Sequence, residues 1–446
     1  MDMTQGKTTK QLILFAFPLM LGSMLQHIYI LTDATIIGKY LGYQSLASVG
    51  SADWLSWLFA SMINGLTMGF CAKVSQDKGT GNQQQFYSSS AMCVLLSFVF
   101  SIFFLFLGQV IAKPALIILK TPADIIDNST VYLRILYLST PISLFYNTIS
   151  AILRANGDSK TPFVAMLISA VTNVTLDLFF VVIIGKGIKS AAIATVISQC
   201  FSLLICLIRF ISTKEVCFPQ KYLRPQGKVI CSILKHSLPP SLQFFLVACS
   251  GLVIQYLTNI QGTIFLAGYT AANKYYGVLE MAAIAVASAL LTYCGQNYGA
   301  RNIYRIKKGI RSGLLIAAIS SLVITLIMVI WGKALLSIFI NAEPNTAEQI
   351  MKYAYQFLMF LSLPLYLLYL HHTLRSILQG VGDYLAPLLS GIIQGVFRVL
   401  SAFIFTRLVG KIGIFIAEPC AWIGSVLFLS TRLIFIVKKK LKPLQE

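Results

Sequence analysis

The sequence predicts an all-α integral membrane protein whose twelve transmembrane helices form two repeats of six. Three observations predict this class. The 446 residues are 57% hydrophobic and only 11% charged, whereas soluble domains carry about 25% charged residues. Apolar runs of about 20 residues, the length that crosses a bilayer, recur along the whole chain. Short motifs of the first half also return in the second half at a nearly constant distance.

The apolar runs place the spans in order along the chain. The first six spans fall near residues 11–37, 45–74, 86–111, 130–153, 162–185 and 188–211. The second six fall near 235–258, 265–293, 309–331, 348–378, 385–408 and 412–436. We therefore expect an N-terminal lobe over 1–212, a hydrophilic cytoplasmic linker over 213–234 and a C-terminal lobe over 235–446.

The strong positive charge indicates topology and lipid contact, not nucleic-acid binding. The chain has 35 Lys and Arg residues against 15 Asp and Glu residues, a formal charge of +20. The basic residues gather in the two termini and the even-numbered loops, which the positive-inside rule places in the cytoplasm. We expect a multi-pass protein of the plasma (cytoplasmic) membrane with both termini cytoplasmic. Anionic membrane lipids are the expected partners of its basic loops.

Two pairs of motifs show how the halves are related. Pro18, after Phe17, returns as Pro239, after Leu238, and Gly157-Asp158 returns as Gly382-Asp383. Because each half has an even number of spans, both enter the membrane from the same side and form a parallel repeat. Such repeats usually place a substrate cavity between two lobes that rock about it. A complete repeat within one chain predicts a monomer.

Ionisable side chains at membrane depth are the strongest functional signal. Each costs at least about 2.5 to 3.5 kcal/mol at mid-bilayer, so it needs a partner, a wet cavity or a function. Asp33 in span 1 and Asp177 in span 5 are the clearest cases. Asn173 lies one helical turn before Asp177 on the same face, and Thr195 lies at a similar depth in span 6. Two carboxylates close together in a low dielectric favour binding of a proton or a cation.

Further polar residues extend this cluster. We expect Asn147 and Ser150 of span 4 and Tyr29 of span 1 to join it. The alternative is a satisfied hydrogen-bond network that holds helices together, as Ser, Thr and Asn often do in membranes. That alternative is favoured for Asn147, Ser150 and Thr195 taken alone. For the two aspartates a function is favoured, because a neutral side chain holds helices together at lower cost.

The second half does not duplicate the acidic pair. Arg398 and Ala402 stand where the repeat places Asn173 and Asp177. We expect Arg398 to form a structural ion pair with Glu418 of span 12. Glu280 in span 8 has no evident partner in the sequence and is a candidate for a carboxylate that faces the cavity. Pro18 lies inside an apolar helix, where a proline removes a backbone hydrogen bond and favours a kink.

Missing motifs exclude other classes of protein. Gly6-Lys7-Thr8 resembles the end of a phosphate-binding loop but lacks its first glycine and a preceding strand. No metalloprotease or hydrolase motif occurs on a credible scaffold. A membrane enzyme would show a cluster of catalytic groups near one membrane face, and the sequence shows none. We therefore expect neither an enzyme nor a bound cofactor, and no ATP-driven step.

Together these residues resemble the multidrug and toxic compound extrusion (MATE) family of cation-coupled antiporters. The resemblance covers roughly residues 10–437. The matching segments are Phe17-Pro18 with Asp33 and Gly38, Val74-Ser75-Gln76, Leu153-Arg154 with Gly157-Asp158 and Pro162, Asn173 with Asp177, and Gly295-Gln296-Asn297-Tyr298-Gly299-Ala300. The resemblance implies a V-shaped pair of six-helix bundles that alternates between inward-facing and outward-facing states.

The resemblance also implies a function for the polar cluster. It implies that H+ or Na+ is the coupling ion and binds at Asp33 and Asp177, together with Asn173 and Thr195. If the ion is Na+, Asp33, Asp177 and Asn173 are its expected protein ligands. It implies that Pro18 is a conformational hinge.

The implied substrates are small molecules, namely organic cations or amphipathic drugs. Aromatic cavity walls at Tyr29, Phe145, Tyr146 and Phe179 suit such compounds through apolar and cation–π contacts. The resulting hypothesis is secondary active multidrug efflux. The alternative is a flippase of the same superfamily that moves lipids or lipid-linked oligosaccharides, which a cavity rich in Arg and Lys would favour.

Overall fold

The computed structural model describes residues 1–119, 121–123, 125–185, 187–338, 340 and 343–438, and every regular element in these residues is helical. The first half contains α1 (Thr8–Tyr40), α2 (Gly42–Gly79), α3 (Gln83–Ile118), α4 (Ile126–Leu138), α5 (Thr140–Ala155), α6 (Lys160–Asp177), the π-helical turn η1 (Leu178–Ile183) and α7 (Ile188–Ser212). A short 3₁₀ helix, η2 (Gln220–Leu223), follows.

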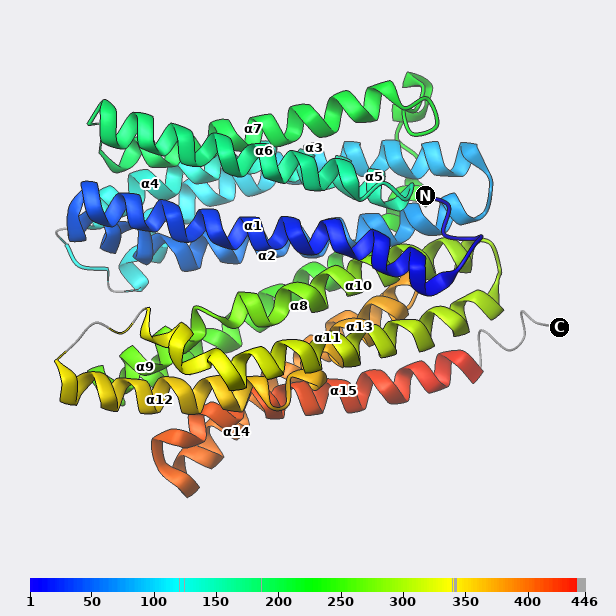
Figure 1. Ribbon diagram of the computed structural model, residues 1–446. Helices are drawn as coiled ribbons and strands as arrows, with labels where there is room; N and C mark the ends of the chain where they lie inside the picture. Colours follow the sequence, from blue (N-terminus) through cyan, green and yellow to red (C-terminus); the bar gives the residue numbers. More distant parts are fainter. Residues whose placement is uncertain (120, 124, 186, 339, 341–342, 439–446) are drawn as a thin grey trace. The chain divides into compact units, whose positions relative to one another are not determined.

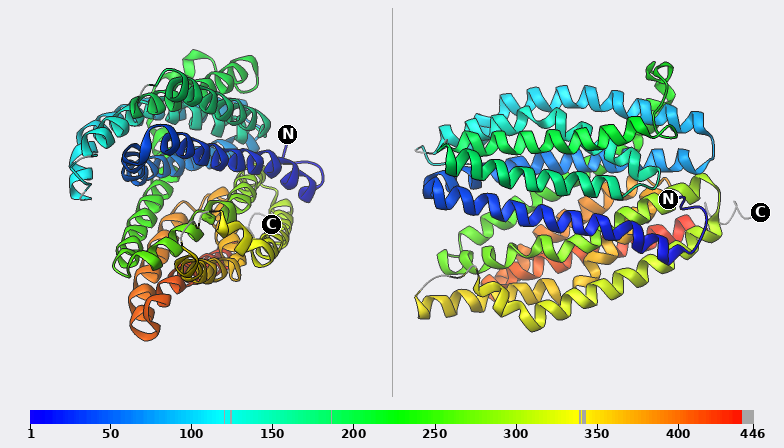
Figure 2. Two further views of the ribbon diagram at one scale, coloured as in Figure 1. Left: turned by 60° about the vertical axis from the view of Figure 1, so that its left-hand side comes forward. Right: turned by 45° about the horizontal axis from the view of Figure 1, so that its top comes forward.

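The second half repeats this order of helices (Figure 1). It contains α8 (Gly227–Asn259), α9 (Thr263–Asn273), α10 (Tyr276–Gly299), α11 (Ile303–Ser337), α12 (Pro344–Ser362), α13 (Leu365–Gly380), α14 (Leu385–Val409), the 3₁₀ helix η3 (Gly410–Ile416) and α15 (Ala417–Ile436). Within their own halves, α6 packs along α7 and α14 packs along α15 (Figure 1, Figure 2).

The long apolar helices confirm a multi-pass α-helical membrane protein. Among the described residues, nine helical ranges are long and apolar enough to cross a membrane, and two bent helix pairs bring the number to eleven. One of the nine, Leu385–Ile436, contains both α14 and α15. The expected number of twelve spans requires these two helices to cross separately, and it stays a prediction.

Spans 4 and 10 are each broken into two helices. The pair α4 and α5 bends by 41°, and the pair α12 and α13 bends by 43°. A proline stands at each break: Pro141 at the start of α5 and Pro364 directly before α13. Each proline lacks an N–H and clashes with the preceding turn, which explains the break. The apolar runs at 130–153 and 348–378 predict one span at each position and do not indicate the break.

The chain folds into two compact units that divide at prolines. Unit 1 contains Met1–Met3 and Phe17–Ser241, and unit 2 contains Thr4–Ala16 and the chain from Leu242 onward. The first part of α1 therefore belongs to unit 2, and the first part of α8 belongs to unit 1. The divisions fall one residue before Pro18 and one residue after Pro240. The predicted lobes, 1–212 and 235–446, describe the sequence repeat and stay a prediction.

Glycines of α2 allow the first part of α8 to pack closely within unit 1. A Cβ atom on Gly65 would lie 2.6 Å from the Cα atom of Ser241, and one on Gly69 would clash with the backbone of Ser237. Small residues are the usual means by which membrane helices bring their backbones together.

Candidate functional site

The structure places Asp177 at a change of helix type. Asp177 is the last residue of α6, and the wider π-helical turn η1 begins at the next residue. Turns of this kind are rare and occur frequently at functional sites, because they interrupt the regular backbone hydrogen bonds. The Asp177 side chain is fully buried. The sequence indicates the residue but not this local backbone.

The two predicted aspartates come together within unit 1. The carboxyl groups of Asp33 on α1 and Asp177 on α6 lie close enough to share a hydrogen bond, which needs a proton on one of them. Among the described residues, no N–H or hydroxyl group donates to either oxygen of Asp177 or to Oδ1 of Asp33. Two buried carboxylates without donors resist simultaneous ionisation. The arrangement therefore favours binding of a proton or a small cation.

Asn173 lies one helical turn before Asp177 and contacts Thr195 on α7. The Nδ2 atom of Asn173 on α6 donates to Thr195 Oγ1 on α7 over 3.4 Å. Thr195 in turn donates to the carbonyl of Ala191 over 3.2 Å. The Oδ1 atom of Asn173 is buried and has no partner among the described residues. An amide oxygen and a hydroxyl oxygen are thus available beside the carboxyl groups.

Tyr29 lies near the acidic pair, and Tyr146 lies near Tyr29. Tyr29 precedes Asp33 by one turn of α1, hydrogen-bonds with the Gln26 side chain and lies within electrostatic range of Asp33 and Asp177. Tyr146 lies in turn within electrostatic range of Tyr29. Both tyrosines are half-buried. These two positions place aromatic side chains beside the cluster.

Other predicted residues make local contacts instead. Asn147 donates to the carbonyl of Ser143 on its own helix over 2.8 Å, and Ser150 accepts from Arg154 over 3.1 Å. The described contacts do not connect either residue to the aspartates. The nearby Phe145 is half-buried. This outcome agrees with the structural alternative for Asn147 and Ser150.

Phe179 and Pro18 occupy distinct local positions. Phe179 lies on η1 and is 45% exposed. The helix α1 runs unbroken from Thr8 to Tyr40 through Pro18, which is half-buried. The role of Pro18 as a hinge stays a prediction.

Asp53 and Tyr132 are members of the cluster that the sequence analysis missed. Both lie within electrostatic range of Asp33. Tyr132 on α4 is buried, whereas Asp53 on α2 is exposed. The signal for Asp53 was present, because it is an acidic residue inside the apolar run 45–74. The signal for Tyr132 was absent, because a tyrosine within a span is ordinary.

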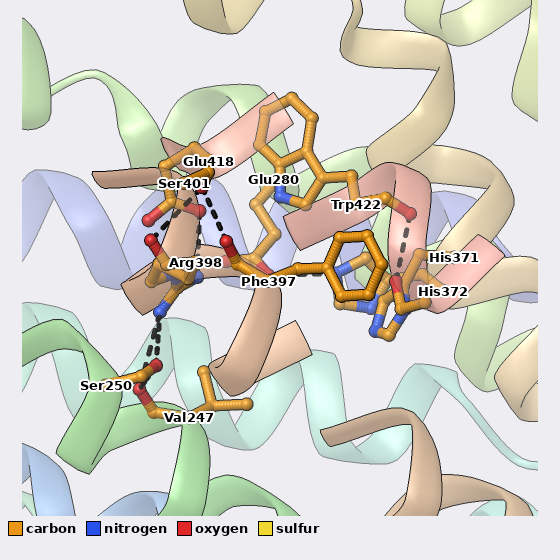
Figure 3. A network of polar contacts seen from close by, with 11 residues as sticks. Val247, Ser250, Glu280, His371, His372, Phe397, Arg398, Ser401, Glu418 and Trp422 are labelled. Carbon is orange, nitrogen blue, oxygen red and sulfur yellow. Dashed lines mark hydrogen bonds and ion pairs between the residues drawn. The ribbon is translucent and has the colours of Figure 1, made fainter. Parts of the chain in front are cut away.

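A second polar network lies in unit 2, and it contains the expected ion pair (Figure 3). Arg398 on α14 donates to Glu418 on α15 over 2.8 Å. Arg398 also donates to Ser250 over 3.1 Å and to the carbonyl of Val247 over 3.4 Å. The guanidinium group is buried and bound on two sides, which fits a structural role.

Glu280 has a partner that the sequence analysis did not identify. Its Oε1 atom lies 2.9 Å from Nε2 of His372 on α13. The Nδ1 atom of His372 lies 3.3 Å from Nη2 of Arg375. Since arginine can only donate, Nδ1 accepts and Nε2 carries the proton that His372 donates to Glu280. The histidine is therefore neutral in this arrangement, and it bridges Arg375 and Glu280.

His371 is held by a separate contact. Its Nδ1 atom lies 2.9 Å from the Ser425 hydroxyl oxygen, and that hydroxyl donates to the carbonyl of Trp422 over 3.0 Å. Ser425 therefore accepts the proton of His371 Nδ1. Both histidines lie inside the apolar run 348–378, so the sequence carried a signal for them that the analysis overlooked.

Neither polar network, as far as the described residues show, contains a metal site built from His, Cys, Asp or Glu side chains. Within the residues that the structure describes, no group of three or more His, Cys, Asp or Glu side chains is placed to hold a metal ion.

The repeated membrane helices and the buried carboxyl pair define a multi-pass membrane transporter. A family model described as MatE matches residues 18–179 and again residues 239–404. The chain therefore belongs to the MatE family. The two matched ranges begin at Pro18 and Pro239, the prolines that mark the sequence repeat.

Relatives and solved structures agree with this assignment. A Bacillus subtilis (strain 168) protein named "Probable multidrug resistance protein YpnP" is 30% identical over 417 residues, covering 93% of this chain and 92% of the relative. "Probable multidrug resistance protein YoeA" of the same organism is 27% identical over 447 residues, covering 97% and 94%. A structure described as a MATE in complex with MaL6 has the same fold, with a TM-score of 0.90 at 21% identity, covering 98% of this chain and 99% of the other.

Proposed function

We propose that the protein exports organic cationic or amphipathic compounds by alternating access, in exchange for H+ or Na+ that binds at Asp33 and Asp177. One observation carries this proposal: two adjacent carboxyl groups lie inside a membrane helix bundle, and the described residues give Asp177 no hydrogen-bond donor. An acidic pair that only stabilised the fold would need donors or a counter-ion to offset its desolvation.

The proposed site binds its ion through oxygen atoms. A proton bridges the two carboxyl groups, or Na+ takes the place of that proton and adds the free Oδ1 atom of Asn173 as a ligand. Occupancy removes the repulsion between Asp33 and Asp177, so it lowers the free energy of the conformation that keeps them together. A ligand shifts a two-state equilibrium in this way when it binds one state more tightly. If the drug binds the other conformation more tightly, the ion and the drug bind in alternation, and the protein exchanges one for the other.

The names of the relatives support the substrate class. Relatives of known name that match over most of this chain are called multidrug resistance or multidrug export proteins. We extend that class to this chain and place it in the plasma membrane as a monomer with both termini in the cytoplasm. Tyr29 and Tyr146 beside the acidic pair are the aromatic groups that we propose contact a cationic drug.

Dye transport in proteoliposomes tests the proposal. Purified protein is reconstituted with a fluorescent cationic dye, and H+ and Na+ gradients are imposed separately. We expect one gradient to drive dye movement in the wild type and expect Asp177→Asn to abolish that movement. Asp127→Asn is the matched control, because Asp127 is an exposed acid that pairs with Lys113.

The outcomes separate the two candidate functions. Gradient-driven movement that is lost in Asp177→Asn and kept in Asp127→Asn supports the proposal and identifies the ion. Full coupled transport by Asp177→Asn would falsify the coupling site. No dye movement under either gradient would contradict drug export, and movement of a fluorescent lipid in the same vesicles would then favour the flippase.

A further inference from the structure

Arg375 differs from Arg398 and Arg432, two other arginines of unit 2, because it lacks a direct counter-ion. Arg398 pairs with Glu418, and Arg432 pairs with the buried Asp383 over 2.6 Å. Arg375 on α13 is only 4% exposed, and among the described residues no carboxylate oxygen lies within ion-pair distance of it. A buried charge without a direct partner costs several kcal/mol.

The existing contacts of Arg375 leave part of its guanidinium group unused. Nη2 contacts His372 over 3.3 Å, and the Phe244 ring lies 5.4 Å from the guanidinium carbon. The Nε atom is buried and has no acceptor. Glu280 lies within electrostatic range of Arg375, and the neutral His372 between them accepts one hydrogen bond and satisfies one donor. At least one strong donor of Arg375 therefore stays unsatisfied.

Gln379 supplies a second set of unused polar atoms beside Arg375. It follows Arg375 by four residues on α13, so both side chains lie on the same face of that helix. Gln379 is 1% exposed, and neither its amide nitrogen nor its amide oxygen has a partner among the described residues. Buried polar groups are normally hydrogen-bonded, so unpartnered donors one helical turn apart are consistent with a missing partner.

A partner that accepts at least two hydrogen bonds would satisfy the free donors of Arg375 and Gln379, and the amide oxygen of Gln379 would still need a donor. The free donors are the Nε–H group of Arg375 and the amide N–H groups of Gln379. The planar guanidinium group binds carboxylate and phosphate oxygens through two parallel hydrogen bonds, and these are stronger than neutral ones. The Phe244 ring beside the guanidinium group favours a fixed orientation of its plane.

We propose that Arg375 and Gln379 form a recognition subsite for an oxyanion, either the carboxylate of an amphipathic solute or the phosphate of a lipid headgroup. The inference rests on the proposed transport function and adds a substrate class to it, namely compounds that carry an acidic group. Arg375 lies five residues before the end of α13, about 7.5 Å along the helix. In the proposed topology that end is cytoplasmic, so an exported compound reaches the subsite from the cytoplasm.

Binding of a matched pair of dyes tests the subsite. One dye is a rhodamine with a free carboxylic acid, and the other is its methyl ester, which has the same ring system without the anion. Full-length protein in phosphatidylcholine nanodiscs is titrated, and the dissociation constants are measured by fluorescence anisotropy. We expect the wild type to bind the acid about tenfold more tightly than the ester, which is the effect of about one charge-assisted hydrogen bond.

Three variants assign the preference to the subsite. Arg375→Gln is expected to bind both dyes equally, Arg375→Lys to keep part of the preference, and Gln379→Leu to reduce it a few-fold. Arg407→Gln is the control, because Arg407 is an exposed arginine of α14, and it is expected to keep the full preference. Size-exclusion profiles check that each variant is folded, and Gln379→Leu tests the proposal if Arg375→Gln does not fold.

Competition identifies the source of the oxyanion. Phosphatidylglycerol is added to the nanodisc. If it weakens binding of the acid dye to the wild type but not to Arg375→Gln, the subsite binds a lipid phosphate. Acid binding that is insensitive to this lipid assigns it to the carboxylate of the solute. Equal binding of acid and ester by the wild type, or a preference that persists in folded Arg375→Gln, overturns the proposal. Because no ion gradient is applied, this result is separate from any failure of coupled transport.

Discussion

The two halves of the chain use the same pair of repeated helices for different polar contacts. In the first half, Asn173 on α6 and Thr195 on α7 form a neutral hydrogen bond of 3.4 Å. In the second half, Arg398 on α14 and Glu418 on α15 form an ion pair of 2.8 Å. The acids of the first half are replaced as well, since Ala402 stands where the repeat places Asp177.

This difference separates charge that is available from charge that is already compensated. Both carboxyl oxygens of Asp177 and Oδ1 of Asp33 lack donors among the described residues, so the proposed ion would offset the cost of burying them. Arg398 and Glu418 neutralise each other, so no ion is needed. The duplicated helices thus keep one architecture, while the position of a few charges determines which half is the proposed site for a cation.

Neutralising the acidic pair is the strongest test of this comparison. We expect Asp33→Asn and Asp177→Asn each to reduce ion-coupled dye transport by at least about a hundredfold, equivalent to about 2.7 kcal/mol, because an amide cannot take up a proton. Initial rates in proteoliposomes measure the effect. Ala402→Asp in the Asp177→Asn background is the matched control, and recovery of coupling by this double variant would contradict a site confined to the first half.

We expect the ion pair of Arg398 and Glu418 to contribute to folding stability and not to ion coupling. Glu418→Gln leaves Arg398 buried without its counter-ion, and we expect a loss of about 3 to 5 kcal/mol in the free energy of unfolding. The double variant Arg398→Met with Glu418→Leu should recover most of that loss, because it removes both charges. Thermal unfolding in detergent measures both effects. If Glu418→Gln is as stable as wild type and loses coupling instead, the ion pair belongs to the transport mechanism.

The N-terminal segment gives a smaller test of how unit 2 is held together. Arg305 donates to the carbonyls of Gln5 and Gly6 and to the Gln11 side chain over 2.8 to 3.1 Å. Tyr293 adds a hydrogen bond of 2.9 Å to Thr8. We expect Arg305→Ala to lower the unfolding free energy by about 1 to 3 kcal/mol, since the half-buried Gln11 and the buried Asn297 side chains lose a charged donor.

The same thermal unfolding measurement checks the Arg305 prediction. Lys308→Ala, at an exposed position on the same helix, is the control and should change stability little. An Arg305→Ala protein with unchanged stability would show that the N-terminal segment packs without this arginine.

The sequence predicts the repeat and the main acids because both depend on short patterns. Apolar length and charge position indicate the spans, and the aspartates are conspicuous in an apolar run. It does not predict the π-helical turn after Asp177 or the contact between Glu280 and His372. The turn depends on how α6 packs, and the contact joins residues 92 positions apart in the chain. Such partners become visible only when helix rotation is known.

Asp158, two residues before the start of α6, supplies the weakest expected effect and a test of pH dependence. Asp158 accepts hydrogen bonds from the Thr161 backbone and hydroxyl and pairs with Arg209 over 3.3 Å. Partial burial raises the pKa of this carboxyl group, but these bonds outweigh the burial and hold its pKa below its usual value. Its contribution is therefore present above the unfolded-state pKa of about 3.9 and is lost as pH falls through the lower folded-state value.

We expect Asp158→Asn to lower stability at neutral pH by about 1 kcal/mol or less, because Asn also caps helices and the partner Arg209 is half exposed. The difference from wild type should shrink as the pH falls below 4, where Asp158 becomes protonated. Thermal unfolding at neutral and acid pH measures this change. A difference that stays constant across this range would mean that the hydrogen bonds of the cap, and not the negative charge, account for the effect of Asp158.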